Sequence, residues 1–177
     1  MNMNCAEMKN RLSQTKRRRN GFTLMELLIV MAIITILMLI AIPNFQRIMK
    51  YSHELSARKS LQTIQVAEQM YADRFPTLGY ACNLSALGGD PSAGPPTQTA
   101  AQLLPQDLAG GDHTGYIFSI NNCQHVTVNS VDRVTSYQMT AVPETVGHSG
   151  DLGYCVDANG IMKQDPTGGT NCTQDVQ

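Results

Sequence analysis

The sequence predicts an α+β protein in which one long N-terminal helix packs, through its second half, against a small antiparallel sheet. Two observations predict this fold. Apolar residues recur at three- and four-residue spacing up to Phe75, and Pro76 then ends the helical pattern. From Gly115 onward short strand-like runs follow one another, and Asn159-Gly160 between two of them is typical of a tight hairpin turn.

Charge divides the chain into a basic head and an acidic body. Residues 1–21 carry six basic residues and one acidic residue, whereas the remainder carries seven basic and thirteen acidic residues, although the overall net charge is only −1. A basic head of this kind indicates processing or membrane orientation. Because the folded part lacks a basic excess, nucleic acid is not expected as a partner.

Residues 22–42 form the first half of the predicted helix and have the length of a membrane span. Glu26 is their only charged residue, and at ~1.5 Å per residue the helix would be about 30 Å long. Because basic residues 16–19 precede the span, residues 1–21 should stay in the cytoplasm and the rest should be exported. The span runs into Pro43 without an Ala-x-Ala site, so it should not be removed as a secretory signal peptide.

Residues 43–75 are predicted to continue the helix as its amphipathic half. Charged residues fall between apolar positions that repeat at helical spacing: Phe45, Ile48, Met49, Leu55, Leu61, Ile64, Ala67, Met70 and Tyr71. A helix of about fifty residues is too long for one small domain. Its first half must therefore project from the domain that its second half packs against.

The rest of the chain is predicted to be a variable loop region, 76–114, followed by a small sheet with a cysteine-closed tail, 115–177. Glycine and proline punctuate the loop region, which contains one short apolar helical piece at 100–108. The predicted strands are 116–120, 126–128, 136–142, 153–156 and 161–163. A composition of 6% aromatic residues without tryptophan indicates a small, light core.

Four cysteines follow the apolar span and predict two disulfides in an oxidising compartment. They are well separated and contain no Cys-x-x-Cys pair, and a small core needs such crosslinks. Free buried thiols are the alternative. Of the three possible connectivities we expect Cys82–Cys123 and Cys155–Cys172, because neighbours along the chain need the least rearrangement to meet.

The stretch Lys16-Arg17-Arg18-Arg19-Asn20-Gly21-Phe22-Thr23-Leu24-Met25-Glu26 resembles the leader junction of type IV prepilins and pseudopilins. The resemblance covers residues 16–45, including Pro43. It implies removal of the leader 1–21 by a prepilin peptidase, N-methylation of Phe22, insertion of 22–42 into the inner membrane, and extraction into a helical filament. It further implies that Glu26 of one subunit pairs with the Phe22 amine of another.

Elementary chemistry agrees with this resemblance. Gly21 has no Cβ, so its backbone can approach a protease closely. A carboxylate such as that of Glu26 costs about 2.5–3.5 kcal/mol at the centre of a membrane helix, and the amine created at Phe22 would offset its charge. Glu26 could instead reach the headgroups by itself. Pro43 removes a backbone donor and favours a kink, or else it marks the boundary between membrane and aqueous helix.

No catalytic or cofactor motif is found, so the protein is not expected to be an enzyme. The four histidines are scattered, and Ser149 lies in a turn-like stretch rather than a nucleophile motif. No cofactor is expected, although Asp151, Asp157 and Asp165 offer oxygen ligands for calcium. A solvated acidic face is the alternative explanation of these three residues.

The leading hypothesis is a structural subunit of a type IV pilus, with a type II secretion pseudopilin as the alternative. Its partners would be further copies, minor pilins or pseudopilins, the prepilin peptidase and an inner-membrane assembly platform. It would cross the inner membrane once before assembly and then form a surface or periplasmic filament. A different class of protein, a bitopic envelope protein with an uncleaved anchor and an exported binding or redox domain, would make Gly21 and Glu26 accidental.

Overall fold

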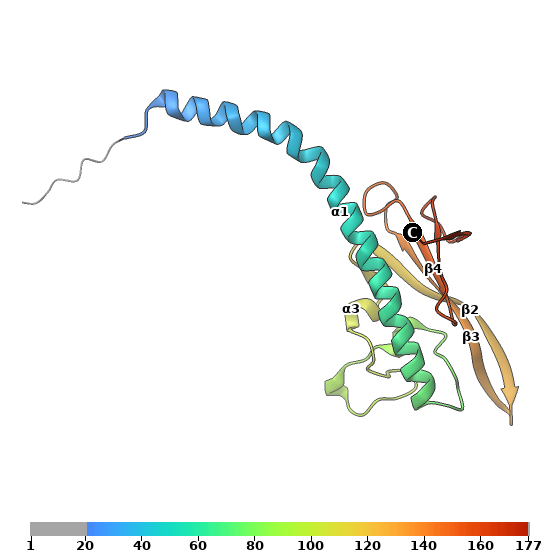
Figure 1. Cartoon of the computed structure of the whole chain (residues 1–177). Helices are drawn as coiled ribbons and strands as arrows, with labels where there is room; N and C mark the ends of the chain where they lie inside the picture. Colours follow the sequence, from blue (N-terminus) through green and yellow to red (C-terminus); the bar gives the residue numbers. More distant parts are fainter. Residues whose placement is uncertain (1–20, 177) are drawn as a thin grey trace, which may run out of the picture. The chain divides into compact units, whose positions relative to one another are not determined.

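The computed structural model describes residues 21–176, without the side chains of Ala41 and Pro43 (Figure 1). The predicted leader therefore lies outside the described residues, except for Gly21. The chain divides between Ala41 and Ile42 into two units. Helix α1 (Leu24–Arg74) contributes to both units, and its bounds agree closely with the helix predicted from residues 22–75.

The first unit consists of the apolar half of α1. Among the described residues no single helix meets the length and hydropathy of a membrane span by itself. The segments Leu24–Ile40 and Asn44–Arg74 meet both criteria only when they are taken together. Helix α1 continues through position 43. The Pro43 side chain is outside the described part, so the kink expected there stays a prediction.

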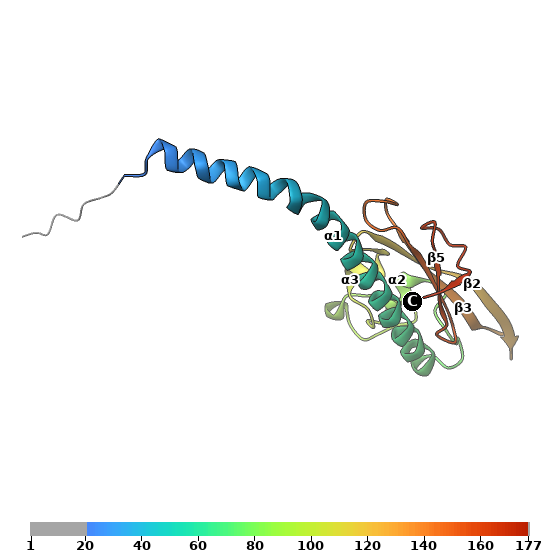
Figure 2. The ribbon, with the colours of Figure 1, turned by 45° about the horizontal axis from the view of Figure 1, so that its top comes forward.

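The second unit is an α+β domain, which confirms the predicted fold class. Figures 1 and 2 show the second half of α1 alongside the sheet, with the segment that carries α2 and α3 at its C-terminal end. One face of α1 is buried in the domain. Its residues recur at three- and four-residue spacing and are each at most 5% exposed: Ala57, Leu61, Ile64, Ala67 and Tyr71. The helix ends where Phe75 N–H bonds the Tyr71 carbonyl, just before Pro76.

The segment between α1 and the sheet contains three short helices rather than the one predicted. They are α2 (Leu84–Leu87), the 3₁₀ turn η1 (Pro91–Ala93) and α3 (Gln106–Ala109). The helix predicted for residues 100–108 is wrong over its first part. Residues 101–104 hydrogen-bond to the backbone of residues 86–88 instead. Pro105 disfavours helical geometry in the residue before it, so α3 begins only at Gln106.

The sheet is a six-stranded antiparallel meander in the order β1-β2-β3-β4-β5-β6. Its strands are β1 (Asp112–His113), β2 (Tyr116–Val128), β3 (Val131–Pro143), β4 (Gly153–Asp157), β5 (Met162–Asp165) and β6 (Gln174–Asp175). The strands predicted at 116–120 and 126–128 are one strand, because pairing with β3 resumes after a bulge near Cys123. Asn129 and Ser130 both have positive φ, as a two-residue hairpin turn requires.

Alternate residues of the central strands complete the core against α1. Tyr116 and Phe118 of β2 are at most 4% exposed, as are Tyr137, Met139 and Ala141 of β3 and Tyr154 and Val156 of β4. Tyrosine supplies much of the volume of this core, since the chain has no tryptophan. Its hydroxyl needs a partner when it is buried, and Tyr116 Oη donates to the Leu152 carbonyl at 2.9 Å.

Two disulfides close the domain, and they are the pairs chosen from the sequence. Cys82 is bonded to Cys123, which joins the segment after α1 to the bulge of β2. Cys155 is bonded to Cys172, which joins β4 to the C-terminal tail. The alternative of four free thiols is therefore wrong.

Candidate functional site

The bond between Gly21 and Phe22 lies outside any helix or strand, just before α1, and is accessible. Both residues are exposed, Phe22 by 87%. A Cβ added at Gly21 would meet nothing within 4 Å, and its φ is not positive. The chain's own described structure therefore does not require glycine at this position. A requirement for glycine would have to come from another protein that grips the backbone here.

Glu26 forms a capping box with Thr23 at the start of α1. Thr23 N–H and its hydroxyl both donate to Glu26 Oε2, each at 2.9 Å, and Glu26 N–H donates to Thr23 Oγ1 at 3.2 Å. Sequence analysis missed the role of Thr23. The signal was visible, because Thr-x-x-Glu before an apolar run is the sequence pattern of this cap.

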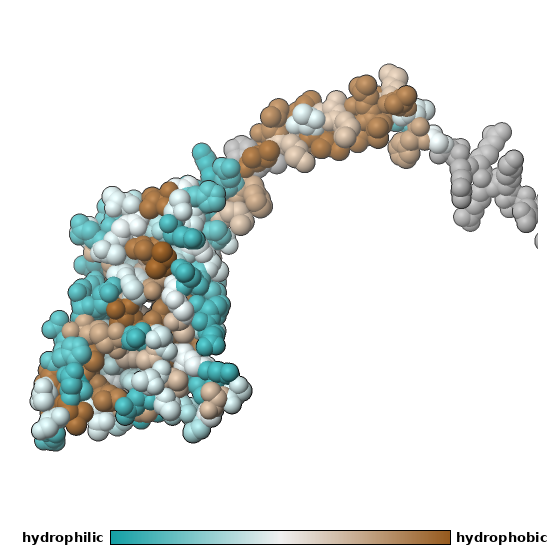
Figure 3. Space-filling view, turned by 180° about the vertical axis from the view of Figure 1, so that it is seen from behind, coloured by the Kyte–Doolittle hydropathy of each residue, from teal (hydrophilic) through white to brown (hydrophobic). Residues whose placement is uncertain are grey.

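Within residues 21–176, the apolar half of α1 leaves its side chains exposed. Every large hydrophobic side chain described between Leu24 and Ile42 is exposed by 42% or more. Figure 3 shows this segment as a brown, hydrophobic surface. An apolar surface of this extent is unfavourable in water, so lipid or other protein helices must cover it.

The second half of α1 also carries apolar side chains that the domain leaves exposed. We call them the outer stripe: Phe45, Ile48, Leu55, Val66 and Met70, which are between 37% and 63% exposed. The sequence pattern included all of these residues except Val66, together with buried ones such as Leu61 and Ile64, in a single amphipathic repeat. The structure separates them into residues that build the core and residues that stay exposed.

The three aspartates considered for calcium are not brought together. Asp151 pairs with Lys50, whose Nζ lies 2.8 Å from Oδ2. Asp157 caps the β4–β5 turn by accepting from Asn159 and Ile161 N–H. The carboxylate of Asp165, a residue only 3% exposed, accepts three hydrogen bonds from two residues of its own turn, and these bonds lower its pKa. Over residues 21–176 no cluster of three or more His, Cys, Asp or Glu is suited to a metal.

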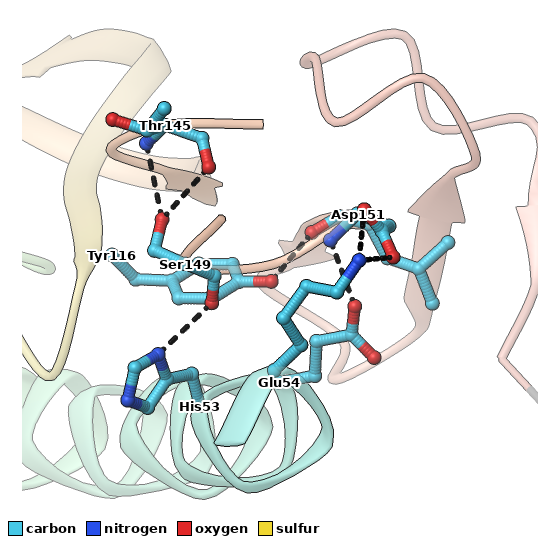
Figure 4. Close-up of polar contacts among 8 residues, drawn as sticks. His53, Glu54, Tyr116, Thr145, Ser149 and Asp151 are labelled. Atoms are coloured by element: carbon cyan, nitrogen blue, oxygen red, sulfur yellow. Dashed lines mark hydrogen bonds and ion pairs between the residues drawn. The ribbon is translucent and has the colours of Figure 1, made fainter. Parts of the chain in front are cut away.

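Ser149 and His53 meet, but not in the geometry of a nucleophile and its base (Figure 4). The Ser149 hydroxyl donates to the Thr145 carbonyl at 3.2 Å and accepts from Thr145 N–H at 3.0 Å. His53 Nδ1 instead donates to the backbone carbonyl of Ser149, at 3.1 Å. The hydroxyl proton is therefore directed away from the imidazole, and Ser149 shapes its own turn.

Lys50, His53 and Glu54 together tie the loop between β3 and β4 to α1. Glu54 Oε1 accepts from Asp151 N–H at 2.9 Å, next to the Lys50–Asp151 ion pair (Figure 4). The ion pair is partly exposed and so contributes about 0–1 kcal/mol. These contacts position the loop on the helix.

Comparison with known proteins adds two findings. The family described as the prokaryotic N-terminal methylation motif matches residues 16–42. The chain is also 28% identical over 206 residues to the type IV major pilin protein PilA of Myxococcus xanthus (strain DK1622), an alignment that covers 88% of this chain and 93% of that protein. No solved structure matches the chain. The two matches confirm the resemblance seen in residues 16–45 of the sequence.

Proposed function

We propose that this chain, which is similar along most of its length to a type IV major pilin, is the structural subunit of a type IV pilus. The observation that carries the proposal is the methylation motif at the start of an uncovered apolar helix that holds one carboxylate. Such a helix suits a protein that first resides in lipid and later polymerises. The similarity is to a pilin, and no observation favours the pseudopilin.

Processing would remove residues 1–21 and methylate the new amine of Phe22. The exposed chain at Gly21 and Phe22, which is neither helix nor strand, supports access by a prepilin peptidase. The mature chain would remain in the inner membrane through residues 22–42, with its domain exported, until an assembly platform moves it into the filament.

Assembly would cover the two apolar surfaces of α1. Residues 22–42 would pack against the same residues of other copies, and the outer stripe would extend this packing along the domain. Burying a side chain of this size contributes roughly 1.5–3 kcal/mol when the side chain starts fully exposed. Covering the five half-exposed residues of the outer stripe would therefore add to the free energy of association between subunits.

Glu26 would set the register of this packing. Within the apolar core of a filament an unpaired ammonium costs several kcal/mol, so the Phe22 amine of one subunit favours positions where it meets the Glu26 carboxylate of another. The capping bonds to Thr23 occupy one carboxylate oxygen, Oε2. The second oxygen, Oε1, has no hydrogen bond within the described chain and can accept from the neighbouring amine.

Four variants of the full-length precursor separate charge pairing from helix capping. Glu26→Val removes both, Glu26→Gln keeps the cap but loses the charge, and Thr23→Ala loses the cap at a cost of about 1 kcal/mol but keeps the charge. We expect the two charge-removing variants to be inserted and cleaved but absent from sheared filaments. Thr23→Ala should assemble, and Glu26→Asp, one methylene shorter, should give an intermediate amount.

Immunoblots of sheared filaments measure assembly, and immunoblots of membranes from the same cells measure insertion and cleavage. Glu144→Gln, which removes an exposed glutamate from the domain, is the matched control and should assemble normally. Abundant filaments from Glu26→Val and Glu26→Gln would show that the carboxylate does not guide assembly.

A further inference from the structure

Glu68 is a carboxyl group sealed inside the domain. It lies on the buried face of α1, between Ile64 and Tyr71, and its relative exposure is 0%. Burying an ionised carboxylate without a counter-charge is costly, so such a group either pairs with a cation or keeps its proton. Among the described residues, no lysine, arginine or histidine contributes to the electrostatic environment of Glu68.

The two oxygens of Glu68 are in different situations. Oε2 accepts a hydrogen bond from Ala81 N–H at 2.7 Å. Oε1 is buried and has no hydrogen-bond partner in the part of the chain that the structure describes. One backbone donor is too little to replace the hydration of a charged carboxylate, so this environment favours the protonated form.

The titratable groups around Glu68 provide no compensating positive charge. Tyr71 on α1 and Tyr137 on β3 lie within its electrostatic reach, and Tyr80 and Asp157 act in turn on Tyr137. Burial raises the pKa of both Tyr71 and Tyr137, so these tyrosines stay neutral. Burial also raises the pKa of Glu68 from 4.5 to about 8, and the bond from Ala81 N–H opposes this shift only in part.

Ala81 belongs to a segment, residues 78–82, that is fixed to the sheet. Tyr80 N–H donates to the Val134 carbonyl of β3, and Val134 N–H donates to the Leu78 carbonyl. Gly79 has φ +77°, and a Cβ there would overlap the Val134 carbonyl oxygen, so only glycine fits this approach. The disulfide at Cys82 adds the link to β2. Glu68 thus joins α1 to a segment that the sheet already holds.

We propose that Glu68 forms a proton-dependent contact between α1 and residues 78–82, which is strong in acid and weakens as the medium becomes neutral and then alkaline. When the segment opens, water reaches the carboxyl and it ionises with an ordinary pKa. Opening therefore releases a proton, and higher pH favours it. The sensitivity extends from about pH 4.5, where the opened form ionises, to about pH 8, where the closed form ionises as well.

Hydrogen exchange of the full-length chain in detergent tests the contact directly. After correction for the intrinsic pH dependence of exchange, we expect amides of residues 78–82 to lose protection about tenfold per pH unit between pH 5 and 8. The loss should level off above that range. Glu68→Gln keeps an acceptor for Ala81 N–H but cannot ionise, so its protection should not depend on pH.

A second measurement uses the wild-type chain, so its result does not depend on how a variant folds. In an NMR titration with ¹³C-labelled glutamate carboxyl groups, one carboxyl should titrate near pH 8. Glu68→Gln serves to assign this signal, which should be missing from its spectrum. Glu144→Gln, at an exposed glutamate, should retain it. A titration of every glutamate near the ordinary value of 4.5 would overturn the proposal. Protection of residues 78–82 that is the same in Glu68→Gln and wild type at every pH would overturn it too.

Discussion

Removing either disulfide should destabilise the exported domain by an amount that follows the length of chain it closes. Residues 42–177 form a compact unit with their own core and both disulfides, so they can be studied as a soluble fragment. The change is a pair of double substitutions, Cys82→Ala with Cys123→Ala, and Cys155→Ala with Cys172→Ala. Alanine avoids placing a new hydroxyl at the buried Cys155 position.

The magnitudes follow from the entropy that each crosslink removes from the unfolded chain. Cys82–Cys123 spans 41 residues, which corresponds to about 4 kcal/mol at 25 °C in the loop-closure relation. Cys155–Cys172 spans 17 residues and corresponds to about 3 kcal/mol. A domain with a total stability of about 5–15 kcal/mol would lose a large fraction of it in either case. We expect the first double variant to be the less stable of the two.

Urea unfolding followed by far-ultraviolet circular dichroism measures both differences, and non-reducing peptide mapping of the parent fragment verifies the connectivity. Two double variants that both unfold within about 0.5 kcal/mol of the parent would refute the crosslink argument. A peptide that links Cys82 to Cys172 would refute the pairing itself.

Four further substitutions test other features of the molecule. Leu61→Ala should cost about 2–5 kcal/mol by leaving a cavity beside the sheet, whereas Val66→Ala on the outer stripe should change domain stability by less than about 0.5 kcal/mol in urea titrations. Gly153→Ala should destabilise severely, because its Cβ would overlap the Gly169 backbone, and a normal melting temperature would contradict this. Gly21→Val should leave the leader attached, since a β-branched side chain blocks close approach of the protease; an immunoblot that shows normal-length chain would contradict it.

The long helix could be predicted because its sequence pattern is local, and the disulfides could be predicted because four cysteines allow few pairings. The helix pattern up to Phe75 continues without interruption, and Pro76 gives a clear end. Four cysteines allow three pairings, and the pairing of neighbours along the chain is the one in the structure. The Gly21–Glu26 junction was informative because glycine, a basic run and an apolar span occur together in one short stretch.

The short elements were missed because pairing with another segment creates them, not a pattern of their own. Strand β1 has two residues and exists because it pairs with Tyr116 and Ile117 of β2, and β6 likewise depends on β5. Residues 101–104 were assigned to a helix from their apolar spacing, yet their backbone bonds the segment around Leu87. Such pairings leave no periodicity for a sequence reader to detect.

Glu68 shows a second limit of the sequence. It is one of the charged residues that fall between the apolar positions of the helix, and glutamate is ordinarily solvated. Helical spacing does not reveal that the segment 78–82 covers this side of α1 and supplies the Ala81 N–H. In the same way, the apolar residues of the outer stripe could not be separated from the core until the sheet was seen to cover only one face.

Mass spectrometry of the chain recovered from sheared surface filaments tests the central claim most directly. Removal of 21 of the 177 residues leaves 156, and the account predicts filaments built from this shortened chain, beginning at Phe22 with a methylated amine. Filaments whose subunits retain residues 1–21, or a chain that stays entirely in the membrane with its leader attached, would contradict it.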